Sequence, residues 1–251
     1  MLQPGLPDRA CAVFLDFDGT LVDLAPRPEA VRLHPALPGL LSRLRGELDG
    51  ALAIVSGRTV AEIDAQLHPL TLCTAGVHGV ERRGVDGYIR RIAIGEMRDA
   101  VALIESLCRR HPALHMEDKR GAIALHYRQA PELEDECLAV MAQAIARTNG
   151  VTLLRGKKVV EMKPQRANKG LAVRSFMDER GFRMRRPWYF GDDVTDESAF
   201  ELVQAMGGVA VKVGEGETLA AHRLPDPAAV RVWLEQAVAA LEPRGVSGAM
   251  P

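Results

Sequence analysis

Two aspartates separated by one residue follow directly after a short apolar run. Asp16 and Asp18 belong to the sequence DFDGTL, which comes after Cys11–Leu15. A carboxylate at a strand end can attack phosphorus, and a second one can protonate the departing alkoxide and then activate water. Gly19 permits a tight turn, and Thr20 offers a hydroxyl and an N–H to phosphate oxygens. A helix cap is one alternative, and a calcium loop is disfavoured because its glycine stands sixth rather than fourth.

Two further polar groups stand just before predicted helices. Ser56-Gly57-Arg58 offers a hydroxyl and backbone N–H groups where a helix begins, which suits a phosphate but is equally typical of a plain helix cap. Lys169, in the sequence NKG, could hold an anionic phosphoryl group and pair with Asp16. Without that context, a single lysine is more typical of solvated surface.

An acidic cluster follows a later apolar run. The sequence GDDVTDE carries Asp192, Asp193, Asp196 and Glu197 close together, and such acids repel one another unless a cation is present. Mg²⁺ prefers carboxylates and waters, so it is the expected cation. Acids placed to match a helix dipole are the alternative, mainly for Asp196 and Glu197. Asp192 is the better metal ligand because it lies nearest the strand end.

Short apolar runs recur along the chain and end repeatedly in glycine, serine or aspartate. They lack polar alternation and precede helical patterns, which predicts buried parallel strands joined by helices. The runs are Cys11–Leu15, Ala51–Val55, Thr71–Ala75, Trp188–Phe190 and Gly208–Val213, and helical spacing covers residues 29–48, 59–67, 168–181, 196–206 and 228–242. Ligands bind beyond the carboxyl ends of strands in such sheets, so the polar groups should meet there.

The region from about Ile94 to Pro164 breaks this rhythm. The pattern predicts two helices and two strands, with period-two alternation in the first strand, as in a sheet that has one wet face. These elements are Glu96–Arg109, Ala122–Arg128, Pro131–Arg147 and Val159–Met162. We therefore expect an α+β insert within an α/β core.

Composition is that of an ordinary globular protein. Of 251 residues, 47% are hydrophobic and 26% charged, and the formal net charge of -1 gives no basic surplus to recommend a nucleic-acid partner. The four cysteines are scattered and are expected to be reduced core thiols. There is no signal-peptide pattern and no apolar run long enough for a membrane helix, so a cytoplasmic protein is expected.

The four motifs DFDGTL, SGR, NKG and GDDVTDE, in this order, resemble those of the haloacid dehalogenase-like phosphohydrolases. The resemblance implies a Rossmann-like parallel-sheet core, with Asp16 as nucleophile and Asp18 as acid and base. It implies Mg²⁺ held by the Asp16 side chain, the Asp18 carbonyl and Asp192. It also implies phosphate binding by Thr20, Ser56, Gly57 and Lys169, with Arg58, Asp193 and Asp196 in supporting positions.

The resemblance extends to the trehalose-6-phosphate phosphatases, the trehalose-forming branch of that family. It is carried by AGVHGVERR, ALHYRQAP and VVEMKP together with GDDVTDE. It implies that the insert is a C2-type cap over residues 95–163, within a core of residues 1–94 and 164–251. Cap residues Glu117, Lys119 and Glu161 are implied to hold the sugar hydroxyls.

Neutral sugar hydroxyls are bound by charged hydrogen-bond donors and acceptors, and Glu117, Lys119 and Glu161 supply both. The alternative for each residue is a charged side chain at the surface with no role in binding. His78 and Arg128 are further candidates for substrate contact, but His78 could instead satisfy local backbone groups. Trp188 and Tyr189 are expected in the core.

The expected function is therefore hydrolysis of trehalose 6-phosphate as the last step of trehalose biosynthesis. Alternatives are a phosphatase of sucrose phosphate, glucosylglycerol phosphate or hexose phosphates, a phosphomutase, or a receiver-like signalling domain. The length of the chain and the presence of Asp18 disfavour a receiver. The expected partner is the small sugar phosphate, with no nucleic acid, no membrane and no obligate protein partner evident.

Overall fold

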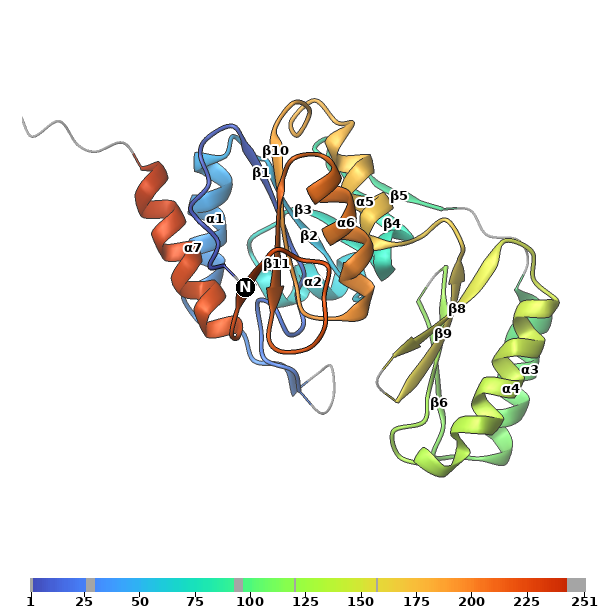
Figure 1. Cartoon of the computed structure of the whole chain (residues 1–251). Coiled ribbons are helices and arrows are strands. Elements are labelled where there is room, and N and C mark those ends of the chain that lie inside the picture. The colour runs from blue at the N-terminus through green and yellow to red at the C-terminus, as the bar shows by residue number, and fades with distance from the viewer. Residues whose placement is uncertain (1, 26–29, 93–96, 120, 157, 243–251) are drawn as a thin grey trace, which may run out of the picture.

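The computed structural model describes the whole chain except residues 1, 26–29, 93–96, 120, 157 and 243–251. The described residues form two β-sheets, one of eight strands and one of four. Figure 1 shows the larger sheet sandwiched between helices and the smaller sheet, backed by its own two helices, beside it.

The larger sheet is built around the strand that ends at the aspartate pair. The strands are β1 (Cys11–Leu15), β2 (Leu52–Val55), β3 (Cys73–Gly76), β4 (Glu81–Arg83), β5 (Ile89–Arg91), β10 (Arg186–Gly191), β11 (Val209–Val213) and β12 (His222–Leu224). Their order is β12-β11-β10-β1-β2-β3-β4-β5. Pairing is parallel from β12 to β3, and β4 and β5 add antiparallel strands at one edge.

Helices cover both faces of this sheet. They are α1 (Leu37–Glu47), α2 (Val60–Leu67), α5 (Lys169–Met177), α6 (Glu197–Ala205) and α7 (Pro227–Leu241). The pair α1 and α7 packs on one face, and α5 and α6 pack together on the other (Figure 1). Local sequence fixes where several of them start: the Thr59 side chain accepts from the Glu62 N–H before α2, and the Asn168 side chain accepts from the Leu171 N–H before α5.

The smaller sheet is antiparallel throughout, with the order β6-β7-β9-β8. Its strands are β6 (His115–Asp118), β7 (Ile123–His126), β8 (Val151–Gly156) and β9 (Val159–Pro164), and its helices are α3 (Arg98–Arg110) and α4 (Glu134–Ala146). Alternate apolar residues of the strands, such as Leu125 and Met162, join a buried cluster with Ile104 and Met141 of the helices. The opposite face of the sheet carries polar side chains, and in Figure 1 this face is turned toward the larger sheet.

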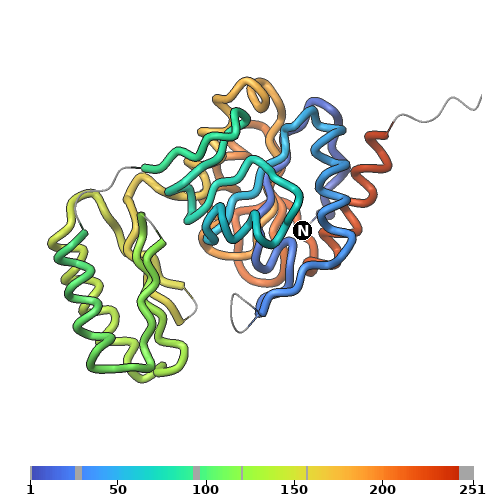
Figure 2. Tube along the Cα trace, turned by 180° about the vertical axis from the view of Figure 1, so that it is seen from behind, coloured from blue at the N-terminus to red at the C-terminus, as the bar shows by residue number. Residues whose placement is uncertain are grey.

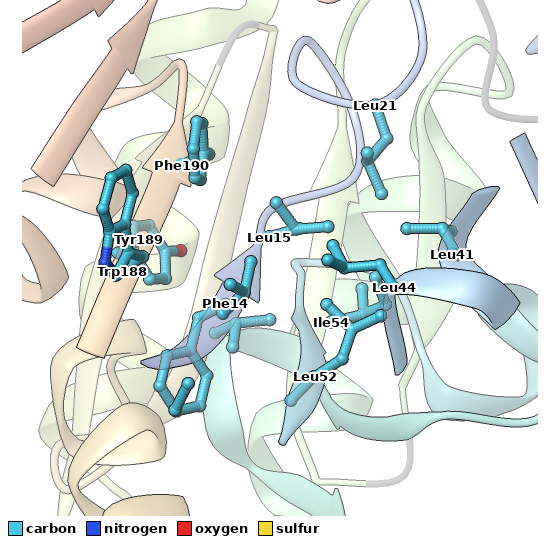
Figure 3. Close-up of a cluster of buried hydrophobic side chains, with 14 of the residues drawn as sticks. Phe14, Leu15, Leu21, Leu41, Leu44, Leu52, Ile54, Trp188, Tyr189 and Phe190 are labelled. Atoms are coloured by element: carbon cyan, nitrogen blue, oxygen red, sulfur yellow. The ribbon is translucent and has the colours of Figure 1, made fainter. Parts of the chain in front are cut away.

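The core of the larger sheet encloses the strand β1 on both faces. Phe14 and Leu15 of β1 are fully buried, as are Ile54 of β2 and Tyr189 of β10. Figure 3 shows the β1 side chains between those of β10 on one side and those of β2 and α1 on the other. Full burial on both faces explains why these strands read as continuous apolar runs.

The predicted α/β class with an α+β insert is confirmed, and most predicted elements agree with the structure to within a few residues. The predicted helix 29–48 is too long, because α1 begins only at Leu37. Pro38, which has no N–H to donate, is tolerated in the first turn of a helix and marks this start. The predicted helix 168–181 ends early, at Met177. Trp188 and Tyr189 lie in the core as expected.

The chain leaves the larger sheet after β5 and returns through β9 into α5, so that the second unit is inserted (Figure 2). The predicted boundary between residues 94 and 95, and Glu96 at the start of the predicted helix, lie outside the described residues. The boundary between residues 163 and 164 falls at the end of β9 and stays a prediction. Within the described part of the chain, no helix is long and apolar enough to cross a membrane.

Candidate active site

Three parallel strands bring the first, second and fourth motifs to one edge of the sheet. Leu15 of β1 is in register with Ile54 of β2 and with Phe190 of β10. The Asp16 N–H then donates to the Phe190 carbonyl at 2.9 Å, which extends the pairing by one residue. The polar residues that follow each strand therefore meet at the carboxyl edge, as the sequence predicts.

Lys169 joins the third motif to the first and fourth. Its Nζ lies 2.8 Å from Asp16 Oδ1 and 2.7 Å from Asp196 Oδ1, and its side chain is only 3% exposed. Burial works against the charged ammonium, but the two carboxylates outweigh it and the pKa of Lys169 is raised. A fixed positive charge therefore stands beside Asp16, in agreement with the predicted pairing.

Asp196 is an anchor, since donors occupy both of its oxygens. Oδ1 accepts from Lys169 and, at 2.6 Å, from the Tyr189 hydroxyl. Oδ2 accepts from the backbone N–H groups of Asp192 at 3.1 Å and Asp193 at 3.0 Å. Asp196 therefore fixes the loop that carries Asp192 and has little capacity left for a metal. Asp193 caps the short helix Val194–Asp196, its carboxylate accepting from the Val194 N–H at 2.6 Å.

Asp16 and Asp192 form a close carboxylate pair. Ligand oxygens of Asp16, Asp192 and Asp196 all lie within 4.8 Å of one another. Burial raises the pKa of Asp16 and, aided by the neighbouring Asp196, raises the pKa of Asp192 to about 6. A buried carboxylate beside a half-buried one is an unfavourable arrangement that a divalent cation would relieve, so the donor set fits Mg²⁺.

Gly19 makes room for this pair. A Cβ at position 19 would lie 2.0 Å from Asp192 Oδ2, and the φ of Gly19 is +79°. The Asp192 carbonyl accepts from Lys212, which holds the same loop from the neighbouring strand β11. The glycine of DFDGTL is therefore required both by its turn and by the close approach of Asp192.

Asp18 is held by a two-pronged bond from Arg58. Arg58 Nε lies 2.6 Å from Asp18 Oδ2, and its Nη2 lies 2.7 Å from Asp18 Oδ1. The guanidinium also lies over the Phe17 ring, 5.5 Å from the ring centre. The second motif therefore positions the second aspartate, a role more definite than the supporting one expected for Arg58.

The predicted phosphate-binding residues lie around the same point. Ser56 is buried and accepts from the Arg58 N–H at 3.1 Å, which shapes the loop between β2 and α2. Thr20 is fully buried, and its Oγ1 has no hydrogen-bond partner among the described residues. A buried hydroxyl without a partner is costly in a native protein and points to a missing ligand group.

A cleft of about 680 Å³ opens over these residues, with walls from both sheets. The larger sheet contributes the four motifs, and the smaller sheet contributes Arg128, Arg155 and Gly156. The lining residues are Asp16, Asp18, Leu24, Ala25, Ser56, Gly57, His78, Arg128, Arg155, Gly156, Lys169, Asp192, Asp193 and Thr195.

The predicted sugar-binding residues lie on the polar face of the smaller sheet, outside the set that lines this cleft. Lys119 Nζ lies 3.4 Å from Glu161 Oε2 and 3.4 Å from the Gly57 carbonyl, so it spans the two units. Glu161 is 4% exposed, and its Oε1 has no partner among the described residues. Glu117 instead pairs with His126 at 2.9 Å, and this hydrogen bond lowers the pKa of Glu117.

Three residues that contribute to the site were not predicted from the sequence, namely Arg155, Tyr189 and Lys212. Arg155 is a single exposed arginine near a turn, which carries no recognisable signal. Tyr189 was expected only as a core residue, and its hydrogen bond to Asp196 was not predicted. A buried tyrosine hydroxyl needs a hydrogen-bond partner, so its place in a buried strand was a usable signal. Lys212, also in a buried strand, was a stronger signal, because a buried lysine needs a partner.

Comparison with known sequences identifies a family for this chain. The family model described as trehalose-phosphatase matches residues 14–227. The trehalose-6-phosphate phosphatase of Escherichia coli (strain K12) is 41% identical over 234 residues, which cover 92% of this chain and 88% of that protein. A probable trehalose-phosphate phosphatase of Sinorhizobium fredii (strain NBRC 101917 / NGR234) is 40% identical over 205 residues, covering 81% of this chain and 77% of that protein.

Solved structures share the fold. A crystal structure of a trehalose-6-phosphate phosphatase related protein matches with a TM-score of 0.72 and 29% identity, covering 91% of this chain and 97% of that one. The C-terminal domain of the trehalose-6-phosphate phosphatase of Candida albicans matches with a TM-score of 0.77 and 21% identity, covering 92% of each chain, and supports the fold only.

Proposed function

The chain belongs to the trehalose-phosphatase family of haloacid dehalogenase-like hydrolases, and within that family we propose that it hydrolyses trehalose 6-phosphate to trehalose and inorganic phosphate. The matching family model and the similar proteins identify the chain as a phosphatase. The observation that carries the proposed mechanism is the buried contact of Asp16 with Lys169, at 2.8 Å, beside Asp192 at the floor of the cleft.

Asp16 is the proposed nucleophile. An oxygen of its carboxylate attacks phosphorus, the bond to the sugar oxygen breaks, and the phosphoryl group moves to the carboxylate. Asp18, oriented by Arg58, gives a proton to the departing sugar oxygen and then takes one from the water that releases phosphate. Lys169 offsets the negative charge that gathers on the phosphoryl oxygens.

The Asp16 and Asp192 side chains would hold Mg²⁺ together with the Asp18 carbonyl. When bound, the ion would supply positive charge that lets an anionic phosphate approach an anionic nucleophile. Thr20, Ser56 and the backbone of Gly57 are proposed to bind the phosphoryl oxygens. The unpartnered hydroxyl of Thr20 supports this role.

The cap is the proposed specificity element. Lys119 and Glu161 lie at the junction with the phosphate loop at Gly57, and Glu161 has a free buried oxygen that a sugar hydroxyl would satisfy. Glu117 is tied to His126, so its share in sugar binding requires that pair to open or to accept a hydroxyl jointly. The four free thiols support a cytoplasmic setting for this enzyme.

The experiment is a phosphate-release assay over trehalose 6-phosphate, sucrose phosphate, glucosylglycerol phosphate, hexose phosphates and p-nitrophenyl phosphate. We expect the highest kcat/KM with trehalose 6-phosphate, and Asp16→Asn should abolish turnover of every substrate while leaving the thermal unfolding midpoint in place. A preference for another sugar phosphate would overturn the substrate assignment. Activity of Asp16→Asn near that of the wild type would overturn the mechanism.

A further inference from the structure

His78 lies at the wall of the cleft in a backbone conformation that few residues with side chains adopt. Its φ is 55°, and that of the preceding Val77, a β-branched residue, is 50°. Left-handed conformations are uncommon outside glycine and are outliers for β-branched residues, and they gather at functional sites. The backbone bonds that hold this turn run to the second motif, from the Val77 N–H to the Arg58 carbonyl at 2.8 Å and from the His78 N–H to the Ser56 carbonyl at 2.9 Å.

The imidazole lies directly against the proposed phosphate loop. A Cβ at position 57 would be 2.9 Å from His78 Cε1 and 3.0 Å from His78 Nε2. Gly57 therefore serves two purposes, because it exposes its backbone to the cleft and lets the ring approach. The strained turn and the missing side chain together bring one imidazole to the place where the phosphoryl group is expected.

One nitrogen of the ring lacks a partner in the described part of the chain. His78 Nδ1 is buried and has no hydrogen-bond partner among the residues that the structure describes. A histidine that served only to satisfy nearby backbone groups would bond to them through its ring. That explanation for His78, open at the level of sequence, does not agree with the structure.

The surroundings of the ring favour its neutral form. Burial lowers the pKa of His78 well below its ordinary value, and the positive charges of Lys169, Lys163 and Lys119 lower it further. A neutral imidazole carries one N–H. Because buried N–H groups without acceptors are rarer than unsatisfied acceptors, we assign the bare nitrogen to Nδ1 and the N–H to Nε2.

We propose that the Nε2–H of His78 donates a hydrogen bond to a non-bridging oxygen of the substrate's phosphoryl group, which makes His78 a further catalytic residue. This inference rests on the proposed phosphatase site. The phosphoryl group is preferred over the sugar as acceptor because His78 lines the cleft together with Asp16 and Lys169, whereas the predicted sugar-binding residues lie outside that lining. A neutral donor stabilises a phosphoryl oxygen without adding a second cation that would compete with Lys169 for Asp16.

Replacing His78 with glutamine or with asparagine distinguishes a hydrogen-bond donor role from a role in the backbone conformation alone. The amide nitrogen of glutamine matches the position of histidine Nε2, whereas that of asparagine matches Nδ1. Asparagine, in turn, tolerates the left-handed backbone better than glutamine does. A donor role therefore predicts that His78→Gln retains function and His78→Asn does not, and a backbone role predicts the reverse order.

The measurements are kcat/KM and the inhibition constant of inorganic phosphate. We expect His78→Gln within about threefold of wild type, and about ten- to hundredfold losses for His78→Asn and His78→Phe, as fits a lost hydrogen bond to an anion. The losses should be equal for p-nitrophenyl phosphate and trehalose 6-phosphate, and phosphate inhibition should weaken in parallel. A higher kcat/KM for His78→Asn than for His78→Gln would overturn the proposal. A loss of kcat/KM confined to trehalose 6-phosphate would overturn it as well.

Direct binding of inorganic phosphate, followed by calorimetry on the wild type and the variants in the presence of Mg²⁺, separates this proposal from the function on which it rests. If the wild type fails to hydrolyse trehalose 6-phosphate but His78→Phe still weakens phosphate binding, the substrate assignment falls and the role of His78 stands. If the wild type is active and phosphate binds to His78→Phe and His78→Gln as to wild type, the role of His78 falls instead.

Discussion

At the scale of single residues, the site contains groups that fix the orientation of the carboxylates proposed to react. Asp196 takes four hydrogen bonds and keeps the Asp192 loop in place, and Arg58 holds both oxygens of Asp18. Catalysis by positioned groups is sensitive to displacements of about 1 Å, so these supporting side chains should matter to the rate nearly as much as those that react.

Arg58→Met should lower kcat by about ten- to hundredfold on every phosphate ester, because Asp18 then loses its orientation. The matched control is Arg82→Met, which removes an arginine that pairs with Glu179 away from the cleft. Steady-state kinetics on p-nitrophenyl phosphate would measure kcat for the wild type and for both variants. An unchanged kcat in Arg58→Met would show that Asp18 needs no such support.

Gly19→Ala and Gly214→Ala separate backbone strain from the crowding of Asp192. The two glycines have φ of +79° and +77°, but a Cβ at position 214 meets nothing within 4 Å, whereas one at position 19 meets Asp192. Both variants should lose roughly 1–2 kcal/mol of unfolding free energy from the left-handed backbone. Only Gly19→Ala should lose activity, and equal activities of the two variants would contradict the role assigned to the close approach.

At the scale of elements, the polar face of the smaller sheet is turned toward the site, and its helices are turned away (Figure 1). Period-two alternation places Glu161 on that polar face and its neighbours Val160 and Met162 in the cap core. One strand, β9, therefore both stabilises the cap and presents a side chain for specificity.

Glu161→Gln should reduce kcat/KM on trehalose 6-phosphate by about one to two powers of ten and leave p-nitrophenyl phosphate unaffected, since only the sugar would touch it. Glu105→Gln, on the outer helix α3 where Glu105 pairs with Arg109, is the control. The two substrates are assayed side by side. Equal effects of Glu161→Gln on both would remove the cap from substrate selection.

The sequence predicted those elements that have a strong apolar pattern and missed the rest. The strands around Asp16 are buried on both faces and were recognisable, whereas β5, an exposed strand with the sequence IRR, and β6, with HMED, have no such pattern. Three of the four motifs could be predicted because each follows directly after a buried strand, and the third, NKG, because it stands just before a helix. Arg155 and the pairing of Glu117 with His126 depend on tertiary packing, which local sequence does not specify.

At the scale of the whole molecule, metal binding should be linked to folding. The carboxylates of Asp16 and Asp192 are brought together only in the folded chain, and a ligand that binds only the folded state raises stability. Mg²⁺ at about one hundred times its dissociation constant should therefore add about 2.7 kcal/mol to the unfolding free energy. A chelator should abolish activity, and added Mg²⁺ should restore it.

Asp192→Asn should lose most of this stabilisation, while Glu197→Gln should keep it, because Glu197 bonds instead to the Leu219 N–H at 2.8 Å. Thermal unfolding with and without Mg²⁺ provides the comparison. A wild type that keeps full activity in excess chelator, or equal Mg²⁺ shifts in the two variants, would argue against the assigned ligands.

The position of β1 between β2 and β10 has a consequence for biosynthesis. During translation β1 and the proposed nucleophile Asp16 emerge well before β10, the strand that flanks β1 on one side and begins only at Arg186. Until then β1 has one flanking neighbour, and the entire inserted unit emerges and can fold first. The emerging chain should therefore carry an exposed, strongly apolar β1 edge until β10 has been made, which makes that interval the one in which chaperone binding matters most.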